Sequence, residues 1–290
     1  MKVIRAKSAG FCFGVERAIG IARSFTSENG TKVYTDGPLI HNRQMMERLK
    51  SEGILEIGDY KSEANLNLGD SASDAVLVVR AHGVSPERRA YLKNLGVNFK
   101  DATCPDVGKI AGQIKMHATK NYTVIIVGDP EHPEVMGLLG YAAPGKGFVV
   151  GSKEDIDALP NITGDICIVS QSTMFTDDYK ELTDYFIQRF PNTKVIDTIC
   201  GATKERQKDV NVLAEKGAQA IVVIGGKHSA NTIKLAIMAE RTNLPCYHVE
   251  TVKELDLKDL KSKYSVIGVT AGASTPDFLI DEVCVVLESL

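Results

Sequence analysis

The chain has 290 residues, of which 43% are hydrophobic and 24% charged, proportions typical of a soluble globular protein with a sizeable core. The net charge is −3 and no apolar run is long enough to span a bilayer, so we expect neither a nucleic-acid nor a membrane partner. Six cysteines are too few for a disulfide scaffold, and no signal peptide is apparent, so we expect a cytoplasmic protein with reduced thiols.

Short β-type runs alternate with helical patterns along the whole chain, which is typical of α/β proteins. Several of these runs are continuous stretches of Val and Ile, which indicate parallel strands covered on both faces. The predicted strands are 32–36, 75–81, 97–103, 122–127, 147–150, 165–170, 194–197, 220–224, 245–249 and 264–270. The predicted helices are 15–25, 44–52, 86–94, 107–120, 177–190, 204–216, 231–241 and 276–287.

Three cysteines lie where an extended run meets the start of a helix. Cys104 is followed by Pro105, and proline suits the first helical position; Cys12 and Cys200 occupy junctions of the same kind. The dipole and the free N–H groups of a helix N-terminus stabilise a thiolate at such a position. Because the cysteines are almost equally spaced, we predict a threefold chain with domains at 1–103, 104–197 and 198–290.

The same three cysteines form a candidate metal or cluster site. They lack the closely paired cysteines of zinc ribbons, whereas iron–sulfur clusters use thiolates, usually four, so that three would leave one iron open. The alternative is that each is a small buried residue, the common fate of a free cysteine. We predict that fate for the cysteines inside apolar elements, which are Cys167, Cys246 and Cys284.

Polar residues end two further predicted strands at matching distances after each of the three cysteines. In open α/β sheets, ligands bind beyond the carboxyl ends of the strands. Three such sheets around one axis would therefore direct these side chains into one central cavity. The residues are His41 and His82 after Cys12, His132 and Ser172 after Cys104, and Ser229 and Ser274 after Cys200.

Each of these residues also has a simpler interpretation. A lone histidine is usually structural, although three at equivalent positions favour a pocket that receives an anion. Ser229, Asn231 and Ser274 lie beside glycines near helix starts, where they would either cap the helix or bind phosphate. Glu134 follows Pro133 in the first turn of a helix, where it would either favour the helix dipole or donate a proton in a cavity.

With these residues assembled, the chain resembles the LytB/IspH family of 4-hydroxy-3-methylbut-2-enyl diphosphate reductases. The resemblance covers essentially the whole chain, and its segments are specific as a set although each is weak alone. They are 10–15, 41–42, 80–84, 102–105, 132–135, 171–173, 198–200 and 272–274.

The resemblance implies a trefoil of three pseudo-repeated α/β domains around a central iron–sulfur cluster and substrate cavity. It implies a [4Fe-4S] cluster held by Cys12, Cys104 and Cys200, with one iron open to substrate. It also implies that Glu134, with Ser172 and His132, belongs to the proton path. The implied contacts of the substrate are His41, His82, His132, Ser172, Ser229, Asn231 and Ser274.

The activity implied by the resemblance is the reductive dehydroxylation of an allylic diphosphate to isopentenyl and dimethylallyl diphosphate. A one-electron donor such as ferredoxin or flavodoxin is also implied, because the chain lacks a nicotinamide-binding fingerprint. Many relatives have serine where this chain has Ala230, so one hydroxyl contact is lost; Ser172 replaces a threonine and keeps the hydroxyl. Some relatives carry an appended nucleic-acid-binding region, and we expect none here. The competing hypothesis is a non-enzymatic metal protein in which zinc or a cluster joins the three parts.

Overall fold

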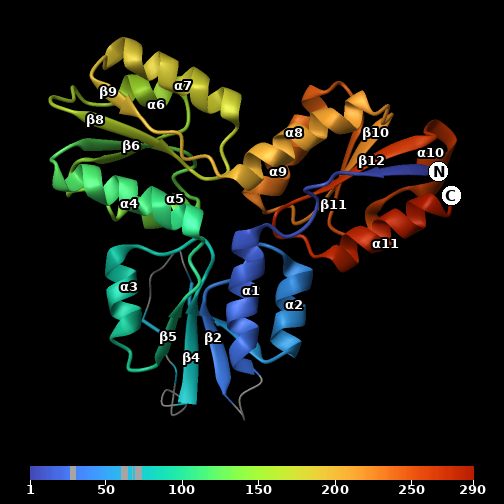
Figure 1. Cartoon of the computed structure of the whole chain (residues 1–290), viewed down its shortest axis with the longest axis horizontal. Helices are drawn as coiled ribbons and strands as arrows, with labels where there is room; N and C mark the ends of the chain where they lie inside the picture. The colour runs from blue at the N-terminus through green and yellow to red at the C-terminus, as the bar shows by residue number, and fades with distance from the viewer. Residues whose placement is uncertain (27–30, 60–64, 67, 69–73) are drawn as a thin grey trace. The chain divides into compact units, whose positions relative to one another are not determined.

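The computed structural model describes residues 1–26, 31–59, 65–66, 68 and 74–290. Within them, parallel strands form three four-stranded sheets whose faces are covered by helices (Figure 1), which confirms the predicted α/β class. The chain divides into two compact units. Unit 1 comprises Met1–Glu16, Ile40–Arg48 and Gly201–Leu290, and unit 2 comprises Arg17–Leu39 and Leu49–Cys200.

Unit 1 contains sheet A, with the strand order β1-β12-β10-β11. Because side chains alternate along a strand, Ile221 and Val223 of β10 pack against α8 and α9, whereas Val222 and Ile224 pack against α10 and α11. These helices lie on opposite faces of the sheet (Figure 1). The strands are β1 (Lys2–Arg5), β10 (Ala220–Ile224), β11 (Cys246–Val249) and β12 (Val266–Ala271). The helices are α8 (Gly201–Glu215), α9 (Ala230–Arg241), η2 (Val252–Glu254), α10 (Leu257–Lys263) and α11 (Asp277–Glu288).

Unit 2 contains sheets B and C, with the strand orders β3-β2-β4-β5 and β7-β6-β8-β9. Sheet C packs α4 and α5 on one face and α6 and α7 on the other. The strands of sheet B are β2 (Lys32–Asp36), β3 (Ile54–Ile57), β4 (Ala75–Val79) and β5 (Asn98–Asp101). Those of sheet C are β6 (Thr123–Val127), β7 (Gly147–Val150), β8 (Ile166–Ser170) and β9 (Thr193–Val195). The helices of unit 2 are α3 (Pro86–Lys93), α4 (Pro105–Thr119), α5 (Pro133–Leu139), α6 (Lys153–Ala158) and α7 (Thr176–Arg189). Two further helices, α1 (Phe13–Thr26) and α2 (Arg43–Ser51), begin in unit 1 and end in unit 2.

The three sheets share one strand order, which confirms the pseudo-repeats. In each sheet one edge strand leads directly to a helix-start cysteine: β5 to Cys104, β9 to Cys200 and β1 to Cys12. The strand at the very start of the chain therefore completes the sheet that is built from its last third. The domain boundaries at 103/104 and 197/198 stay a prediction.

Most elements follow the predicted pattern, and the differences have local causes. The strands β1 and β3 and the helices α6 and α10 were not predicted, because segments of four to seven residues carry too little periodicity. The strand predicted at 75–81 ends at Val79. Beyond it, Arg80 Nε donates to Gly83 O (3.3 Å), and Gly83 N–H donates back to Arg80 O (3.0 Å), in a turn that glycine permits with φ of +73°.

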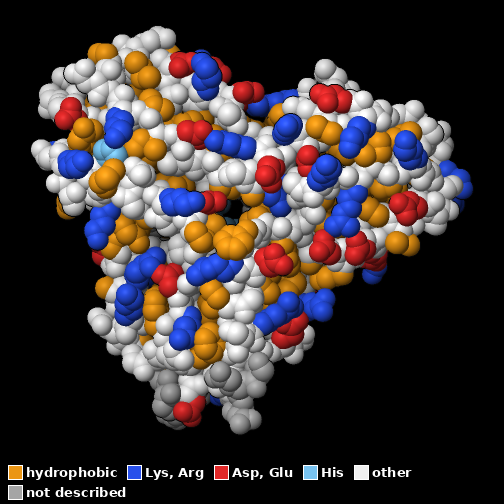
Figure 2. Space-filling view, viewed as in Figure 1, with side chains coloured by type: hydrophobic (Ala, Val, Ile, Leu, Met, Phe, Trp, Pro, Cys, Tyr) orange, Lys and Arg blue, Asp and Glu red, His pale blue; other side chains and the backbone are white. Residues whose placement is uncertain are grey.

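The surface of the described residues carries charges of both signs. On the face shown in Figure 2, lysine and arginine side chains are interspersed with aspartate and glutamate. Among the helices in the described ranges, none is long and apolar enough to cross a membrane.

Candidate active site

The three predicted thiol ligands lie at helix starts, as the sequence predicts. Cys104 is the N-cap residue of α4, and its side chain makes no capping hydrogen bond to the helix. The carbonyl of Cys12 accepts a hydrogen bond from Glu16 N–H (2.9 Å) at the start of α1, and Cys200 directly precedes α8. All three cysteines are half-buried, so these residues lie at the margin of the protein core and not inside it.

The backbone N–H of each cysteine makes an equivalent hydrogen bond. In every case the acceptor is a backbone carbonyl in the loop after the neighbouring strand of the same sheet. This carbonyl belongs either to the polar residue predicted at that strand end or to the residue directly before it. The acceptors are Ala273 for Cys12 (3.1 Å), Ala81 for Cys104 (2.8 Å) and Ser172 for Cys200 (3.0 Å). The fold thus fixes each cysteine next to a predicted substrate residue: Ser274, His82 and Ser172.

The other three cysteines have different surroundings. Cys167 is fully buried in sheet C, which confirms its predicted core position, whereas Cys246 and Cys284 are half-buried at the margins of the sheet A core. Burial raises the pKa of the Cys167 and Cys246 thiols to about 11, and it also raises the pKa of Cys284. Because the thiolate is the form that binds metal, these residues are poor candidates for ligands.

These raised pKa values predict slow alkylation of Cys246 in metal-free protein. A thiol with a pKa of about 11 is thiolate in only about one molecule in 1,000 at pH 8, and this fraction grows about tenfold for each pH unit up to the pKa. Iodoacetamide labelling followed by peptide mapping should therefore show a rate at Cys246 that still rises between pH 9 and pH 10. A rate at Cys246 equal to that of free cysteine at pH 8 would contradict the assignment.

In unit 2, a buried carboxylate lies against the predicted proton-path serine. Glu134 is 1% exposed in the first turn of α5, and Ser172 is 6% exposed in the loop after β8. Ser172 donates from its backbone N–H to Glu134 Oε1 and from its hydroxyl to Glu134 Oε2, both at 2.6 Å. Two short hydrogen bonds from one residue fix the position of the carboxylate, and the Ser172 hydroxyl is well placed to exchange a proton with it.

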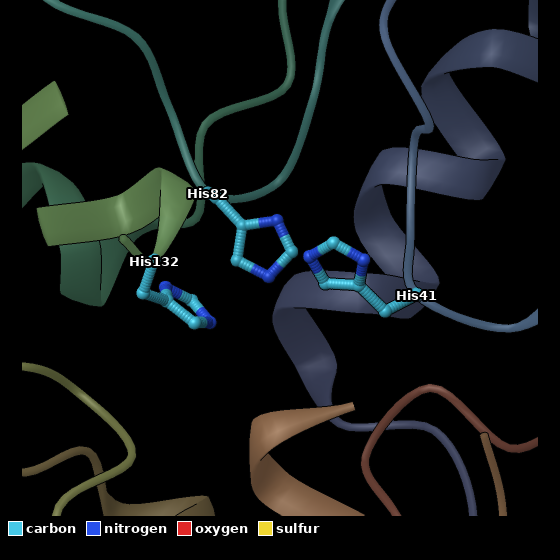
Figure 3. Close-up of side chains that lie close together, drawn as sticks. All are labelled: His41, His82 and His132. Carbon is cyan, nitrogen blue, oxygen red and sulfur yellow. The ribbon is translucent and has the colours of Figure 1, made fainter. Parts of the chain in front are cut away.

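Two histidines of unit 2 lie next to this pair. His132 is the N-cap residue of α5, and its Nδ1 accepts the Glu134 N–H (3.2 Å), which leaves Nε2 as the nitrogen that can donate. His82 packs edge-on against His132, with ring centroids 5.5 Å apart and an interplanar angle of 81° (Figure 3). His82, His132, Glu134 and Ser172 therefore form one polar cluster, while His41, which Figure 3 also labels, belongs to unit 1.

In unit 1, the predicted diphosphate residues of the first and third parts come together. The Ser274 hydroxyl donates to His41 O (3.1 Å), and Gly226 approaches the same carbonyl so closely that an added Cβ would lie 3.2 Å from it. Ser229 is the N-cap residue of α9, accepting a hydrogen bond from Thr232 N–H (3.4 Å), so its capping interpretation is confirmed. Ser274, in contrast, does not cap α11, whose N-cap residue is Pro276.

Two buried amide donors in unit 1 have no acceptor in the part of the chain that the structure describes. Among the described residues, the Nδ2 atoms of Asn231 and Asn42 have no hydrogen-bond partner. Asn42 is 2% exposed and uses its Oδ1 to cap α2 through Met45 N–H (2.8 Å). Buried polar atoms are seldom left without a partner, so both amides favour a ligand with acceptor oxygens. Asn42 is not among the site residues predicted from the sequence, although its place directly after His41 was the available signal.

The protein is thus an α/β protein of three like sheets, and it carries half-buried cysteines at helix starts beside a cluster of polar side chains. Residues 3–288 match the family described as LytB protein. The chain therefore belongs to the LytB family, which confirms the resemblance found in the sequence.

Similar proteins span the whole chain. The 4-hydroxy-3-methylbut-2-enyl diphosphate reductase of Opitutus terrae is 62% identical over 292 residues, covering 100% of both chains. The protein of the same name from Aquifex aeolicus is 39% identical and covers 97% of this chain and 94% of its own. Among solved structures, the E-1-hydroxy-2-methyl-but-2-enyl-4-diphosphate reductase of Plasmodium falciparum matches 99% of this chain and 87% of its own, with a TM-score of 0.89 and 29% identity. A second structure, of the (E)-4-hydroxy-3-methyl-but-2-enyl diphosphate reductase described as the terminal enzyme of the non-mevalonate pathway, matches 100% of both chains at 36% identity with a TM-score of 0.71.

Proposed function

We propose that this chain is an iron–sulfur oxidoreductase that removes the hydroxyl group of (E)-4-hydroxy-3-methylbut-2-enyl diphosphate. Two electrons and two protons enter, water leaves, and the product is isopentenyl or dimethylallyl diphosphate. The names of full-length relatives support the reaction. The structural observation that carries the proposal is the buried Glu134 carboxylate, which accepts two hydrogen bonds from Ser172. The carbonyl of Ser172 also accepts the N–H of Cys200, so this residue contacts both the carboxylate and a cysteine.

The donor set fits an iron–sulfur cluster. Cys12, Cys104 and Cys200 are half-buried at helix starts, where negative charge on sulfur is favoured, while the pKa values of the remaining thiols are raised by burial. We assign the three residues as ligands of a [4Fe-4S] cluster, with one iron left for substrate. When bound, such a cluster would pass on singly the two electrons of an external donor and would act as a Lewis acid toward the departing oxygen.

The protein residues supply binding and proton transfer. In our proposal, His41, Ser229, Asn231 and Ser274 of unit 1 bind the diphosphate through neutral donors and imidazole, with the N-terminus of α9 adding N–H groups. His82 and His132 are also contacts of the diphosphate in this proposal. Glu134 holds the proton for the leaving oxygen, and Ser172 orients Glu134 and exchanges the proton with it.

Asn231→Ala tests the diphosphate contact. Its Nδ2 is buried without a partner among the described residues, so a phosphate oxygen would complete its hydrogen bonding. Loss of one hydrogen bond to a charged group costs about 1.5–3 kcal/mol, which corresponds to about a 10- to 100-fold higher Kd for a diphosphate inhibitor. Calorimetric titration gives this value directly, and an unchanged Kd would remove Asn231 from the site.

A one-electron donor such as ferredoxin or flavodoxin would supply the electrons in our proposal, and a cytoplasmic location stays a prediction.

The metal content of anaerobically purified protein tests the cofactor. We expect iron and acid-labile sulfide with a broad visible absorption band. Colourless protein that contains zinc would instead support a non-enzymatic metal protein whose three cysteines have a structural role.

A further inference from the structure

In unit 1, a buried arginine of α8 holds the loop that leads to Cys12 against the helix start that follows Cys200. Arg206 lies on α8 and is 3% exposed. Its Nη2 donates to Gly10 O (2.6 Å) and its Nη1 donates to Ala202 O (3.0 Å). In the chain, Gly10 lies two residues before Cys12, and Ala202 lies two residues after Cys200. One guanidinium group thus holds the segment that enters α1 against the first turn of α8.

A second side chain of α8 holds the same loop. Asp209 follows Arg206 by three positions, so both lie on one side of the helix. Its Oδ2 accepts hydrogen bonds from the backbone N–H (2.8 Å) and the hydroxyl (2.7 Å) of Ser8. The path of the loop also needs glycine at position 10, where φ is +120° and a Cβ would lie 3.0 Å from Asp277 Oδ1.

The contact of the Arg206 guanidinium group with these two carbonyls is suited to fixing the segments of metal ligands before the metal binds. A guanidinium group offers donors in a rigid planar fork, and hydrogen bonds from a charged donor are stronger than those between neutral groups. Ligands bind metal best when the surrounding contacts have fixed their segments beforehand, because less order must then be created on binding. Neither Gly10 O nor Ala202 O touches the metal in this scheme, so the effect of Arg206 would pass through the backbone.

We propose that Arg206 is a positioning residue for the cluster: by holding Gly10 and Ala202 together, it presets the segments that carry Cys12 and Cys200. The inference rests on the proposed iron–sulfur function. It assigns to Arg206 no contact with substrate and no part in proton transfer. Its loss should therefore weaken the retention of iron before it alters any step of the reaction.

The test compares Arg206→Lys with a control, Arg189→Lys, which changes an exposed arginine. Arg189 of α7 also donates to carbonyl groups, those of Ile156 (2.5 Å), Asp157 (2.8 Å) and Leu159 (2.8 Å), but none of these lies near a cysteine in the chain. Each variant is reconstituted anaerobically, and the rate of iron loss to a ferrous chelator is measured together with the thermal midpoint of the metal-free protein. Changing outer-shell partners of a metal site commonly lowers metal affinity about 10–100-fold, so we expect Arg206→Lys to lose iron at least about tenfold faster than the wild type. Arg189→Lys should lose iron at the wild-type rate.

The outcomes separate the proposals. Wild-type protein that holds no iron would defeat the proposed cluster and with it this inference. Iron in the wild type and an unchanged rate of loss in Arg206→Lys would defeat the positioning role alone. Equal acceleration in both variants, or an insoluble Arg206→Lys protein, would also overturn it, because either result would show that the arginine supports the fold in general.

Discussion

Glu134→Gln should lower turnover by about 10²–10⁴-fold while substrate binding stays near normal, because the variant loses the proton that general acid catalysis requires. Glutamine keeps the shape of the site. Its Oε1 would still accept the Ser172 N–H, and its Nε2 would donate to the Ser172 hydroxyl oxygen, so both contacts remain, the second with donor and acceptor exchanged. Steady-state turnover and inhibitor affinity, measured on variant protein with matched iron content, separate chemistry from binding.

A matched control for this change is Glu131→Gln. Glu131 precedes α5 by two positions and is exposed, so it shares the neighbourhood of the helix start but not the buried contact with Ser172. A carboxylate that serves only the helix dipole contributes about 0.3–1 kcal/mol of stability. If Glu134→Gln behaved like Glu131→Gln, with near-normal turnover, the proton path would lose its proposed donor.

Replacing Cys12, Cys104 or Cys200 by serine should remove most of the bound iron. A serine hydroxyl is not ionised at neutral pH and is a poor ligand for iron, so each change leaves a three-ligand site with two thiolates. Changing a residue that only contacts a metal ligand commonly lowers metal affinity by about 10–100-fold. Because a ligand itself is lost here, we expect iron and sulfide per chain to fall by more than about tenfold. Iron content should be determined on anaerobically purified protein.

The remaining cysteines provide the controls for that experiment. Cys246→Ser and Cys284→Ser alter half-buried thiols whose pKa values are raised, and they should leave iron near the wild-type level. Cys167→Ser should do the same, although a hydroxyl in that fully buried position costs about 1–3 kcal/mol of stability. Equal iron in all six variants would end the assignment of the ligands.

Much of the fold follows from local pattern. The Val/Ile runs at Thr123–Val127 and Ala220–Ile224 are buried central strands, and α4 begins at Pro105, directly after the cysteine. Local pattern failed for Lys2–Arg5, a four-residue edge strand that is nowhere fully buried. Its pairing with Val266–Ala271 joins the two ends of the chain, and no short-range signal encodes such a partner.

The site residues could be chosen from their positions at strand ends, but their contacts could not. Glu134 and Ser172 were both selected, yet the bidentate contact across 38 positions depends on the packing of α5 against the loop after β8. Arg206 was not selected, because a basic residue in a polar helix such as α8 usually faces solvent. Its burial becomes evident only once the Gly10 loop is in place.

The most direct test of the proposed function is anaerobic turnover of (E)-4-hydroxy-3-methylbut-2-enyl diphosphate with iron-loaded protein and a reduced one-electron donor. Product analysis should show isopentenyl and dimethylallyl diphosphate, with two electrons consumed for each molecule formed. The same protein stripped of iron should form neither. Iron-loaded protein that consumes no donor and leaves the hydroxylated diphosphate intact would contradict the account.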